Sequence, residues 1–216
     1  MARESLKSKQ QRAIEVAKRM DLHYGDAPCA LDYGGDPFRL LIAVALSAQT
    51  TDKAVNKVTP ALWAKYPDIP SMAAARASDI EEIIRSIGFY KRKSINCVQA
   101  AQVVLSEFGG EVPQTIEELT RIPGVGRKSA NVIMHVVFHK ADGIAVDTHV
   151  FRIAHKLKFS HAKTADQTEQ DLLKVFPRET WVNVNSQWVL FGRETCIARR
   201  PKCESCFLND ICPSSI

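Results

Sequence analysis

Four cysteines near the C-terminal end are the residues whose spacing points most directly to chemistry. Cys196, Cys203, Cys206 and Cys212 follow the spacing C-x6-C-x2-C-x5-C within seventeen residues. A segment this short cannot fill a hydrophobic core, so we expect its thiols to hold one shared centre. Four thiolates suit either a tetrahedral zinc ion or an iron–sulfur cluster. Only one C-x2-C pair is present, whereas structural zinc sites usually bring two, so the spacing favours iron–sulfur over zinc.

A pair of disulfides is the alternative, and it requires an oxidising compartment. Residues 1–20 are charged and lack the apolar region of a signal peptide. The longest apolar run, residues 40–46, is far shorter than the ~18 residues of a membrane span. We therefore expect a cytoplasmic protein without a membrane partner, in which clustered cysteines indicate a metal centre. Cys29 and Cys97 stand apart, and we expect both to be small buried hydrophobic residues.

A second motif is the string TRIPGVGRKSA at residues 120–130. A helix from about 116 should end at Pro123, and the next should begin at Arg127 or Lys128 after the turn Gly-Val-Gly. The N–H groups of such a turn and the positive end of the following helix suit a phosphate. An ordinary helix–helix turn is the alternative, but the full string is typical of a helix-hairpin-helix motif, which grips the DNA backbone. Val125 would fill the gap between its helices.

Two charged residues beside these motifs suit covalent catalysis. Lys128 lies in the first turn of a predicted helix next to Arg127, and positive surroundings favour the neutral amine that a Schiff-base nucleophile requires. A plain phosphate contact is the alternative role. Asp147, in the string AVDTHVFR, stands at the predicted N-cap of the next helix. Its carboxylate could stabilise a developing cation, and capping the helix does not exclude that role.

The elements that must position these residues are helices. Apolar periodicity and caps predict helices over 8–24, 38–48, 52–66, 92–107, 128–138, 149–157 and 181–192. Asp36 followed by Pro37 should open the second of these helices. Further helix signals are capping boxes at Ser78, Thr115 and Thr164, and C-cap glycines at Gly88 and Gly109. Residues 143–146 alone resemble a strand, and four residues cannot support a sheet, so the fold class is all-α.

Composition sets wider bounds. The chain has 216 residues, 45% of them hydrophobic, which suits one large domain or two small ones. Its 29 Lys and Arg exceed its 24 Asp and Glu, giving a formal net charge of +5. That excess is compatible with nucleic acid but is weak support by itself.

Residues 122–128, residues 146–149 and the cysteine spacing, in this order, resemble the bacterial endonuclease III family of DNA glycosylases and AP lyases. The resemblance covers nearly the whole chain, including residues 40–52 and 86–93. It implies two helical domains flanking a DNA-binding cleft. One is a six-helix barrel with the helix-hairpin-helix, residues 28–139. The other is a four-helix iron–sulfur domain, residues 1–27 plus 140–216, with a [4Fe–4S] cluster on the four cysteines.

The resemblance also implies a mechanism. Lys128 would attack C1′ of a flipped-out nucleotide as an oxidised pyrimidine leaves, Asp147 would stabilise the sugar cation, and β-elimination would cut the 3′ side. Gln49 and Phe89 would fill the gap in the duplex, although the family usually carries leucine where Phe89 stands. The alternatives are that Gln49 is only a polar residue at a helix end and that Phe89 is a core aromatic. The implied DNA contacts are Gln49, Phe89, Gly124, Val125, Gly126, Arg127, His149, Arg199, Arg200 and Lys202, with His149 structural or on a phosphate.

Three other functions would each use only part of this pattern. A non-catalytic helix-hairpin-helix DNA-binding protein would not need both Lys128 and Asp147. An iron–sulfur mismatch adenine glycosylase usually lacks the lysine and carries an extra C-terminal domain. A ferredoxin-like electron carrier would leave the hairpin unused. We therefore expect a monomeric bacterial enzyme, associated with the nucleoid, acting on double-stranded DNA with damaged or abasic nucleotides.

Overall fold

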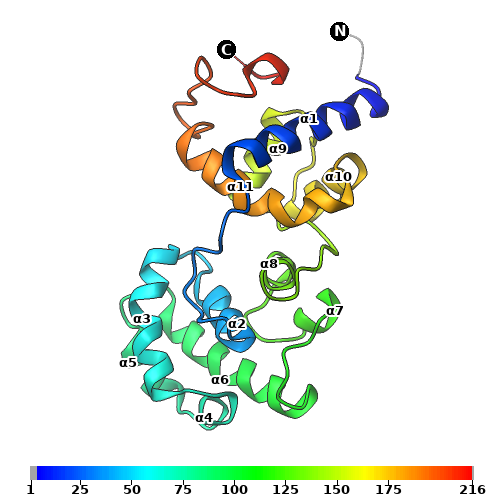
Figure 1. Ribbon diagram of the computed structural model, residues 1–216. Coiled ribbons are helices and arrows are strands. Elements are labelled where there is room, and N and C mark those ends of the chain that lie inside the picture. The colour runs from blue at the N-terminus through cyan, green and yellow to red at the C-terminus, as the bar shows by residue number, and fades with distance from the viewer. Residues whose placement is uncertain (1–3, 216) are drawn as a thin grey trace. The chain divides into compact units, whose positions relative to one another are not determined.

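The computed structural model describes residues 4–215, and every regular element in that range is helical (Figure 1). The all-α class is thus confirmed, and residues 143–146 are extended without forming a strand. No helix in the described part combines the length and apolar character that a membrane crossing requires. The α-helices are α1 Leu6–Tyr24, α2 Pro37–Leu46, α3 Asp52–Lys65, α4 Ile69–Ala73, α5 Ala77–Ile84, α6 Tyr90–Glu107, α7 Ile116–Leu119, α8 Arg127–Phe138, α9 Thr148–Lys156, α10 Ala165–Val175 and α11 Trp181–Glu194. Two 3₁₀ turns, η1 Arg178–Thr180 and η2 Asn209–Ile211, complete the set.

The chain divides into two compact units. One comprises Cys29–His139, and the other comprises the described residues up to Pro28 together with those from Lys140 onward. The bounds expected from the sequence were 28–139 and 1–27 plus 140–216, of which residues 1–3 and 216 lie outside the described residues. Each unit has a hydrophobic cluster of its own, as a compact domain requires.

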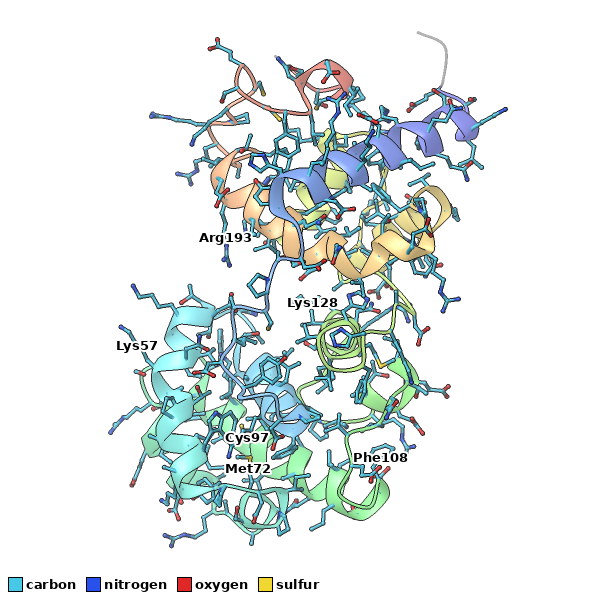
Figure 2. The ribbon with its side chains drawn as sticks, viewed as in Figure 1. Lys57, Met72, Cys97, Phe108, Lys128 and Arg193 are labelled. Carbon is cyan, nitrogen blue, oxygen red and sulfur yellow. The ribbon has the colours of Figure 1, made fainter. Side chains whose placement is uncertain are left out.

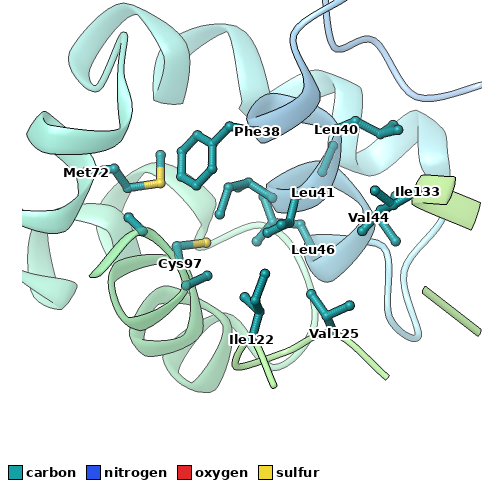
Figure 3. Close-up of a cluster of buried hydrophobic side chains, with 14 of the residues drawn as sticks. Phe38, Leu40, Leu41, Val44, Leu46, Met72, Cys97, Ile122, Val125 and Ile133 are labelled. Atoms are coloured by element: carbon teal, nitrogen blue, oxygen red, sulfur yellow. The ribbon is translucent and has the colours of Figure 1, made fainter. Parts of the chain in front are cut away.

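Helix α2 is the centre of the unit Cys29–His139. It starts as predicted, because the Asp36 carboxylate accepts hydrogen bonds from the backbone N–H groups of Phe38 (2.8 Å) and Arg39 (3.0 Å), with Pro37 at the first position. All its apolar side chains after Pro37 are buried, and α3, α6 and α8 pack against it. Figure 3 shows Ile122 and Val125 in the same core, so the hairpin turn is fixed to α2 by burial.

The second unit packs α1, α9, α10 and α11 around Trp188, which is fully buried. Phe176 meets the Trp188 ring edge-on at 5.6 Å and the Phe159 ring at 5.0 Å between centroids, a favourable aromatic geometry. Helix α9 packs against α11. This contact holds the start of α9, where Asp147 stands, on the helix that leads into the cysteine segment.

Several predicted helix ends are confirmed. Thr115 and Thr164 are N-caps whose hydroxyls accept from the backbone N–H groups three residues later, at 3.2 and 3.3 Å. Gly109 follows α6 with φ +63°, as a left-handed helix terminator should.

Three predicted helix ends are wrong. Helix α7 ends at Leu119 rather than at Pro123. Helix α5 starts before Ser78, with Arg76 as an N-cap that makes no side-chain cap bond. The Arg76 guanidinium instead pairs with Asp79 at 2.9 Å, which ties down this first turn. Gly88 is not the left-handed residue of its loop, because Phe89 takes that conformation with φ +59° and caps α6.

Candidate functional site

The turn between α7 and α8 is held by three short-range backbone hydrogen bonds. The N–H groups of Arg121, Ile122 and Val125 each donate to the carbonyl three residues earlier, at 3.0 to 3.1 Å. Gly124 is required here for two reasons. Its φ is +87°, and an added Cβ would lie 3.1 Å from Nδ2 and 3.2 Å from Cβ of Asn96 on α6. Glycine alone therefore allows the hairpin to approach α6 this closely.

Gly126 serves the site differently. It is the N-cap of α8 with an extended backbone, φ −90° and ψ 174°, which other residues can adopt. It supplies no side-chain cap, and nothing lies within 4 Å of the point where a Cβ would stand. The first N–H groups of a helix have no partner within that helix, and the helix dipole adds positive potential there. The start of α8 is therefore suited to an anion such as a phosphate.

Lys128 is the second residue of α8 and is half-buried (Figure 2). Its charge interacts electrostatically with the Cys29 thiol, and so does the charge of Asp52. Burial is the largest cause of the raised pKa of the Cys29 thiol, Asp52 adds to it, and Lys128 opposes it. The sequence interpretation gave neither Cys29 nor Asp52 a place beside the lysine. Cys29 is only half-buried, so the expectation that it is a buried residue is wrong. Cys97 is fully buried as expected, and burial raises its pKa to about 12.

Asp147 is the N-cap of α9, as predicted. One carboxylate oxygen, Oδ1, accepts from the backbone N–H groups of His149 and Val150, both at 2.8 Å. The side chain is half-buried. With two bonds on Oδ1, the carboxylate is fixed in orientation while Oδ2 stays available to a further partner.

His149 ties α9 to α11. Its Nδ1 lies 3.2 Å from the Arg152 guanidinium, and a Cβ on Gly192 would stand only 2.6 Å from that nitrogen. Burial lowers the pKa of His149, and the positive charges of Arg152 and Arg193 add to this against the opposing charge of Asp147. A neutral, packed imidazole fits the structural role that the sequence left open for it.

Gln49 and Phe89 share an unusual backbone. Gln49, in the loop after α2, has φ +53°, and Phe89, before α6, has φ +59°. Both are exposed, and Phe89 exposes 67% of its surface, which excludes the alternative that it is a core aromatic. Left-handed residues other than glycine are strained by ~1–3 kcal/mol and gather at functional sites.

The four clustered cysteines line one cavity of about 80 Å³ between the end of α11 and the chain that follows it. Backbone hydrogen bonds close the segment: the N–H of Lys202 donates to Thr195 at 2.9 Å, and that of Cys206 donates to Cys203 at 3.1 Å. None of the six cysteines takes part in a disulfide. The disulfide alternative is therefore wrong for this segment.

This cavity fits a cluster better than a single zinc ion. A single water needs only ~10–15 Å³ on the same scale. No three Cys, His, Asp or Glu side chains among residues 4–215 converge on a point where one ion could be held. Burial raises the pKa of Cys196 and Cys206, so their thiolate forms require an adjacent cation. The Leu208 N–H donates to the Cys206 sulfur at 3.4 Å, an interaction that tunes iron–sulfur sites.

The segment around the cavity is anchored from two helices. From α9, Arg152 donates through Nη1 to the Cys196 carbonyl at 2.7 Å. From α1, Arg19 donates to the Phe207 carbonyl at 2.9 Å and pairs with Asp210 at 2.5 Å. The Arg152 bond holds the start of the loop between the first two cysteines, and the Arg19 bonds hold the segment that follows Cys206. The loop presents three exposed cations: Arg199, Arg200 and Lys202.

Comparison with known proteins bears on this arrangement. The family described as HhH-GPD superfamily base excision DNA repair protein matches residues 42–178. Endonuclease III of Synechocystis sp. is 44% identical over 208 residues, which cover 96% of this chain and 94% of that protein. Endonuclease III of Escherichia coli K12 is 42% identical, over 93% of this chain and 94% of that protein. This chain belongs to the endonuclease III family.

Solved structures agree with that membership. A trapped endonuclease III–DNA covalent intermediate superposes with a TM-score of 0.88 at 39% identity, covering 95% of this chain and 96% of that one. A thermostable thymine-DNA glycosylase, at 22% identity and a TM-score of 0.82, shares the fold. The iron–sulfur binding domain of endonuclease III matches residues 196–212, which begin and end on a cysteine of the cavity. The chain therefore carries an iron–sulfur cluster, and the zinc alternative is set aside.

Sequence reasoning missed the residues that hold these endonuclease III features in place. Asn96 packs under the hairpin glycine, Arg152 joins α9 to the first cysteine, and Lys93 contacts the loop that carries Gln49. Each lies 28 or more residues from its partner along the chain, so no local pattern signals the contact. Of these three residues, only Lys93 lay in a stretch that the sequence analysis had singled out, because residues 86–93 were part of the family resemblance.

Proposed function

We propose that this chain excises oxidised pyrimidine bases from double-stranded DNA and then cleaves the strand 3′ to the vacated site. By family it is a DNA glycosylase and AP lyase of base excision repair. One observation carries the assignment of the nucleophile. Lys128 stands in the first turn of α8, two residues after the uncapped N-terminus that suits a DNA phosphate. A phosphate held there would bring the sugar–phosphate backbone close to the amine.

The proposed chemistry uses two groups of this chain. The damaged base leaves with the electrons of the N-glycosidic bond, and the Lys128 amine forms a bond to C1′. The nitrogen passes one proton to the departing base through water, and its lone pair then breaks the C1′–O4′ bond while O4′ takes a proton from water, which gives a ring-opened iminium. The iminium makes the C2′ proton acidic. Loss of that proton to water breaks the bond between C3′ and the phosphate oxygen, and the phosphate leaves with the electrons of that bond. The Asp147 carboxylate stabilises the positive charge that develops on the sugar as the base departs. Its two bonds from α9 keep it oriented throughout.

Phosphate contacts would supply most of the DNA affinity. The N–H groups at the start of α8 and the exposed cations Arg199, Arg200 and Lys202 are the groups we assign to this role. The interaction is electrostatic and reads no bases, so affinity should fall as salt rises. Gln49 and Phe89 are assigned to the gap left by the flipped nucleotide. Both are exposed, as insertion requires.

The iron–sulfur centre has a structural role in this proposal. Cys196, Cys203, Cys206 and Cys212 would hold a [4Fe–4S] cluster, which fixes both ends of the cationic loop. Both catalytic candidates and all four cysteines come from one chain, so a monomer would carry every group that the proposed reaction needs. An enzyme that repairs chromosomal DNA would act at the nucleoid of a bacterial cytoplasm.

The decisive experiment is borohydride trapping on a duplex with one oxidised pyrimidine. A Schiff base on Lys128 should be reduced to a stable covalent adduct with the wild-type protein. Lys128→Gln should abolish the adduct and strand cleavage while DNA binding persists, because the hairpin backbone is unchanged. Lys57→Gln removes an exposed lysine of α3 and is the matched control. If Lys128→Gln protein were still trapped, another amine would be the nucleophile.

A further inference from the structure

Lys93 is a buried lysine in the first turn of α6. It exposes only 5% of its surface, although lysine is among the residues least often buried. Its ammonium donates to the Thr50 hydroxyl oxygen at 2.6 Å and makes no ion pair with any carboxylate among residues 4–215. Burial lowers the pKa of Lys93 accordingly. A charge kept in such a place disfavours folding, so its presence calls for a reason other than stability.

The position of Lys93 supplies that reason. Its side chain reaches Thr50, the residue next to left-handed Gln49. Its backbone N–H donates to the carbonyl of left-handed Phe89 at 3.1 Å. One residue thus connects two loops that are forty residues apart in sequence and that carry both candidates for filling the gap in DNA.

The loop of Gln49 is otherwise held by short-range contacts. The Thr50 N–H donates to Ser47 at 3.0 Å, and its hydroxyl donates weakly to Ala48 at 3.4 Å. These bonds tie the loop to the end of α2 but not to α6. The Lys93 ammonium adds the only cross-link we find between the two loops in the described hydrogen bonds.

We propose that Lys93 is a positioning residue that locks the loops of Gln49 and Phe89 together, so that both side chains enter the duplex as one rigid wedge. This inference rests on the proposed function, which assigns those two side chains to DNA. A wedge ordered before binding loses less conformational entropy on the DNA. It also keeps the flipped nucleotide in register with the nucleophile, since a ~1 Å misplacement can slow catalysis about a hundredfold.

Lys93→Met tests the inference because the new side chain has a similar length and no charge. A merely structural lysine would leave a less stable protein when replaced. A positioning lysine predicts the opposite pair of results: an unfolding temperature equal to or above that of the wild type, and weaker insertion. Insertion is measured with a duplex that carries 2-aminopurine opposite a tetrahydrofuran abasic analogue. The measured quantity is the change in 2-aminopurine fluorescence when saturating protein, loaded with its cluster, binds this duplex. We expect Lys93→Met to lose most of the fluorescence change on binding.

The rate of catalysis is the second measurement. Lys93→Met should lower the single-turnover rate of base excision about ten- to a hundredfold at saturating protein. Its affinity for undamaged duplex should stay at the wild-type level, because no phosphate contact is lost. Lys57→Met, at an exposed site on α3, controls for the lost charge and should match the wild type in all assays.

Thr50 provides a pair of variants that leaves Lys93 in place. Thr50→Ser keeps the hydroxyl acceptor and should keep both insertion and rate, whereas Thr50→Val removes it and should reproduce Lys93→Met. Wild-type fluorescence changes in Lys93→Met and Thr50→Val would overturn the positioning role while excision and trapping in the wild type left the proposed function intact. An easily unfolded Lys93→Met with unaffected Thr50→Val would mean a structural lysine only. Absence of excision by the wild type would defeat the proposed function itself.

Discussion

Alanine at Gly124 and alanine at Gly126 should have opposite effects, although the two glycines are two residues apart. At Gly124 the backbone has φ +87°, where an L residue is strained by ~1–2 kcal/mol. The new Cβ would also meet Asn96 at 3.1 and 3.2 Å, and such overpacking costs ~1–3 kcal/mol. Loss of glycine's freedom in the unfolded chain offsets ~0.4–1 kcal/mol. We expect Gly124→Ala to lower the free energy of unfolding by about 1–5 kcal/mol.

At Gly126 none of these penalties applies, because the backbone is extended and the space around the Cβ position is open. Gly126→Ala should leave stability unchanged or raise it by ~0.4–1 kcal/mol. Its methyl group would instead stand at the N-cap of α8, on the path by which a phosphate would approach the start of that helix. Binding should weaken alike for damaged and undamaged duplexes, because a phosphate contact carries no sequence information.

Urea denaturation followed by far-UV circular dichroism measures the first effect, and fluorescence anisotropy with labelled duplexes at several salt concentrations measures the second. Equal midpoints for the two variants would refute the strain and the Asn96 contact at Gly124. A Gly126→Ala protein that changed lesion preference, while binding undamaged DNA normally, would refute the phosphate role of the hairpin.

Two further predictions concern charge. Asp147→Asn keeps an N-cap but loses the negative charge, so the single-turnover rate of base excision should fall about a hundred- to a thousandfold. The rate of cleavage at a preformed abasic site should fall less, because no base departs. Equal losses of rate on both substrates would contradict the role of the carboxylate. Burial lowers the pKa of Lys93, so the unfolded state binds more protons at alkaline pH and stability rises with pH there. The burial penalty is fully present below the folded-state pKa and is relieved as pH approaches ~10.4. Urea denaturation should therefore give Lys93→Met a higher free energy of unfolding than the wild type near neutral pH, and the difference should narrow at alkaline pH. A difference that does not change with pH would contradict the burial of a charged Lys93.

The parts of the fold that sequence could predict depend on contacts within one turn of chain. An N-cap such as Asp36 or Thr164 bonds to N–H groups two or three residues away, so its signal is complete in a four-residue window. The same holds for Asp147 at α9. These rules erred where two local signals competed. Ser78 resembled a cap, but α5 begins before it, and Arg76 pairs with Asp79 across that first turn.

Helix α4 shows the limit of a restricted template. Its start is a capping box in which the Asp68 carboxylate accepts from the Ser71 N–H at 2.8 Å and the Ser71 hydroxyl lies 3.3 Å from the Asp68 N–H. A search for glutamate or glutamine at the third position misses a serine there. Five residues also give too short a stretch for apolar periodicity to register. Its existence is set by packing against α6.

The candidate site divides along the same line. Its reactive residues lie in short strings whose types and spacing can be read directly, as with the cysteines and the residues around Lys128. Their supports cannot be read this way. The Cys196 carbonyl is bound by Arg152, 44 positions away, and Gly124 packs on Asn96 from another helix. Such partners are chosen by the fold, and a side chain suited to them looks ordinary in the sequence.

Backbone strain separates ordinary turns from the candidate wedge. Among the described residues, four non-glycine positions have positive φ: Gln49, Phe89, His139 and Lys158. His139 caps the end of α8, and Lys158 follows the cap of α9, so helix termination explains both. Gln49 lies beyond the end of α2 and Phe89 stands at the start of a helix, where termination explains neither. Both unexplained residues are exposed, and both loops meet at buried Lys93. Strain without a local cause, held in place by a buried charge, is what a surface shaped for a ligand rather than for stability should show.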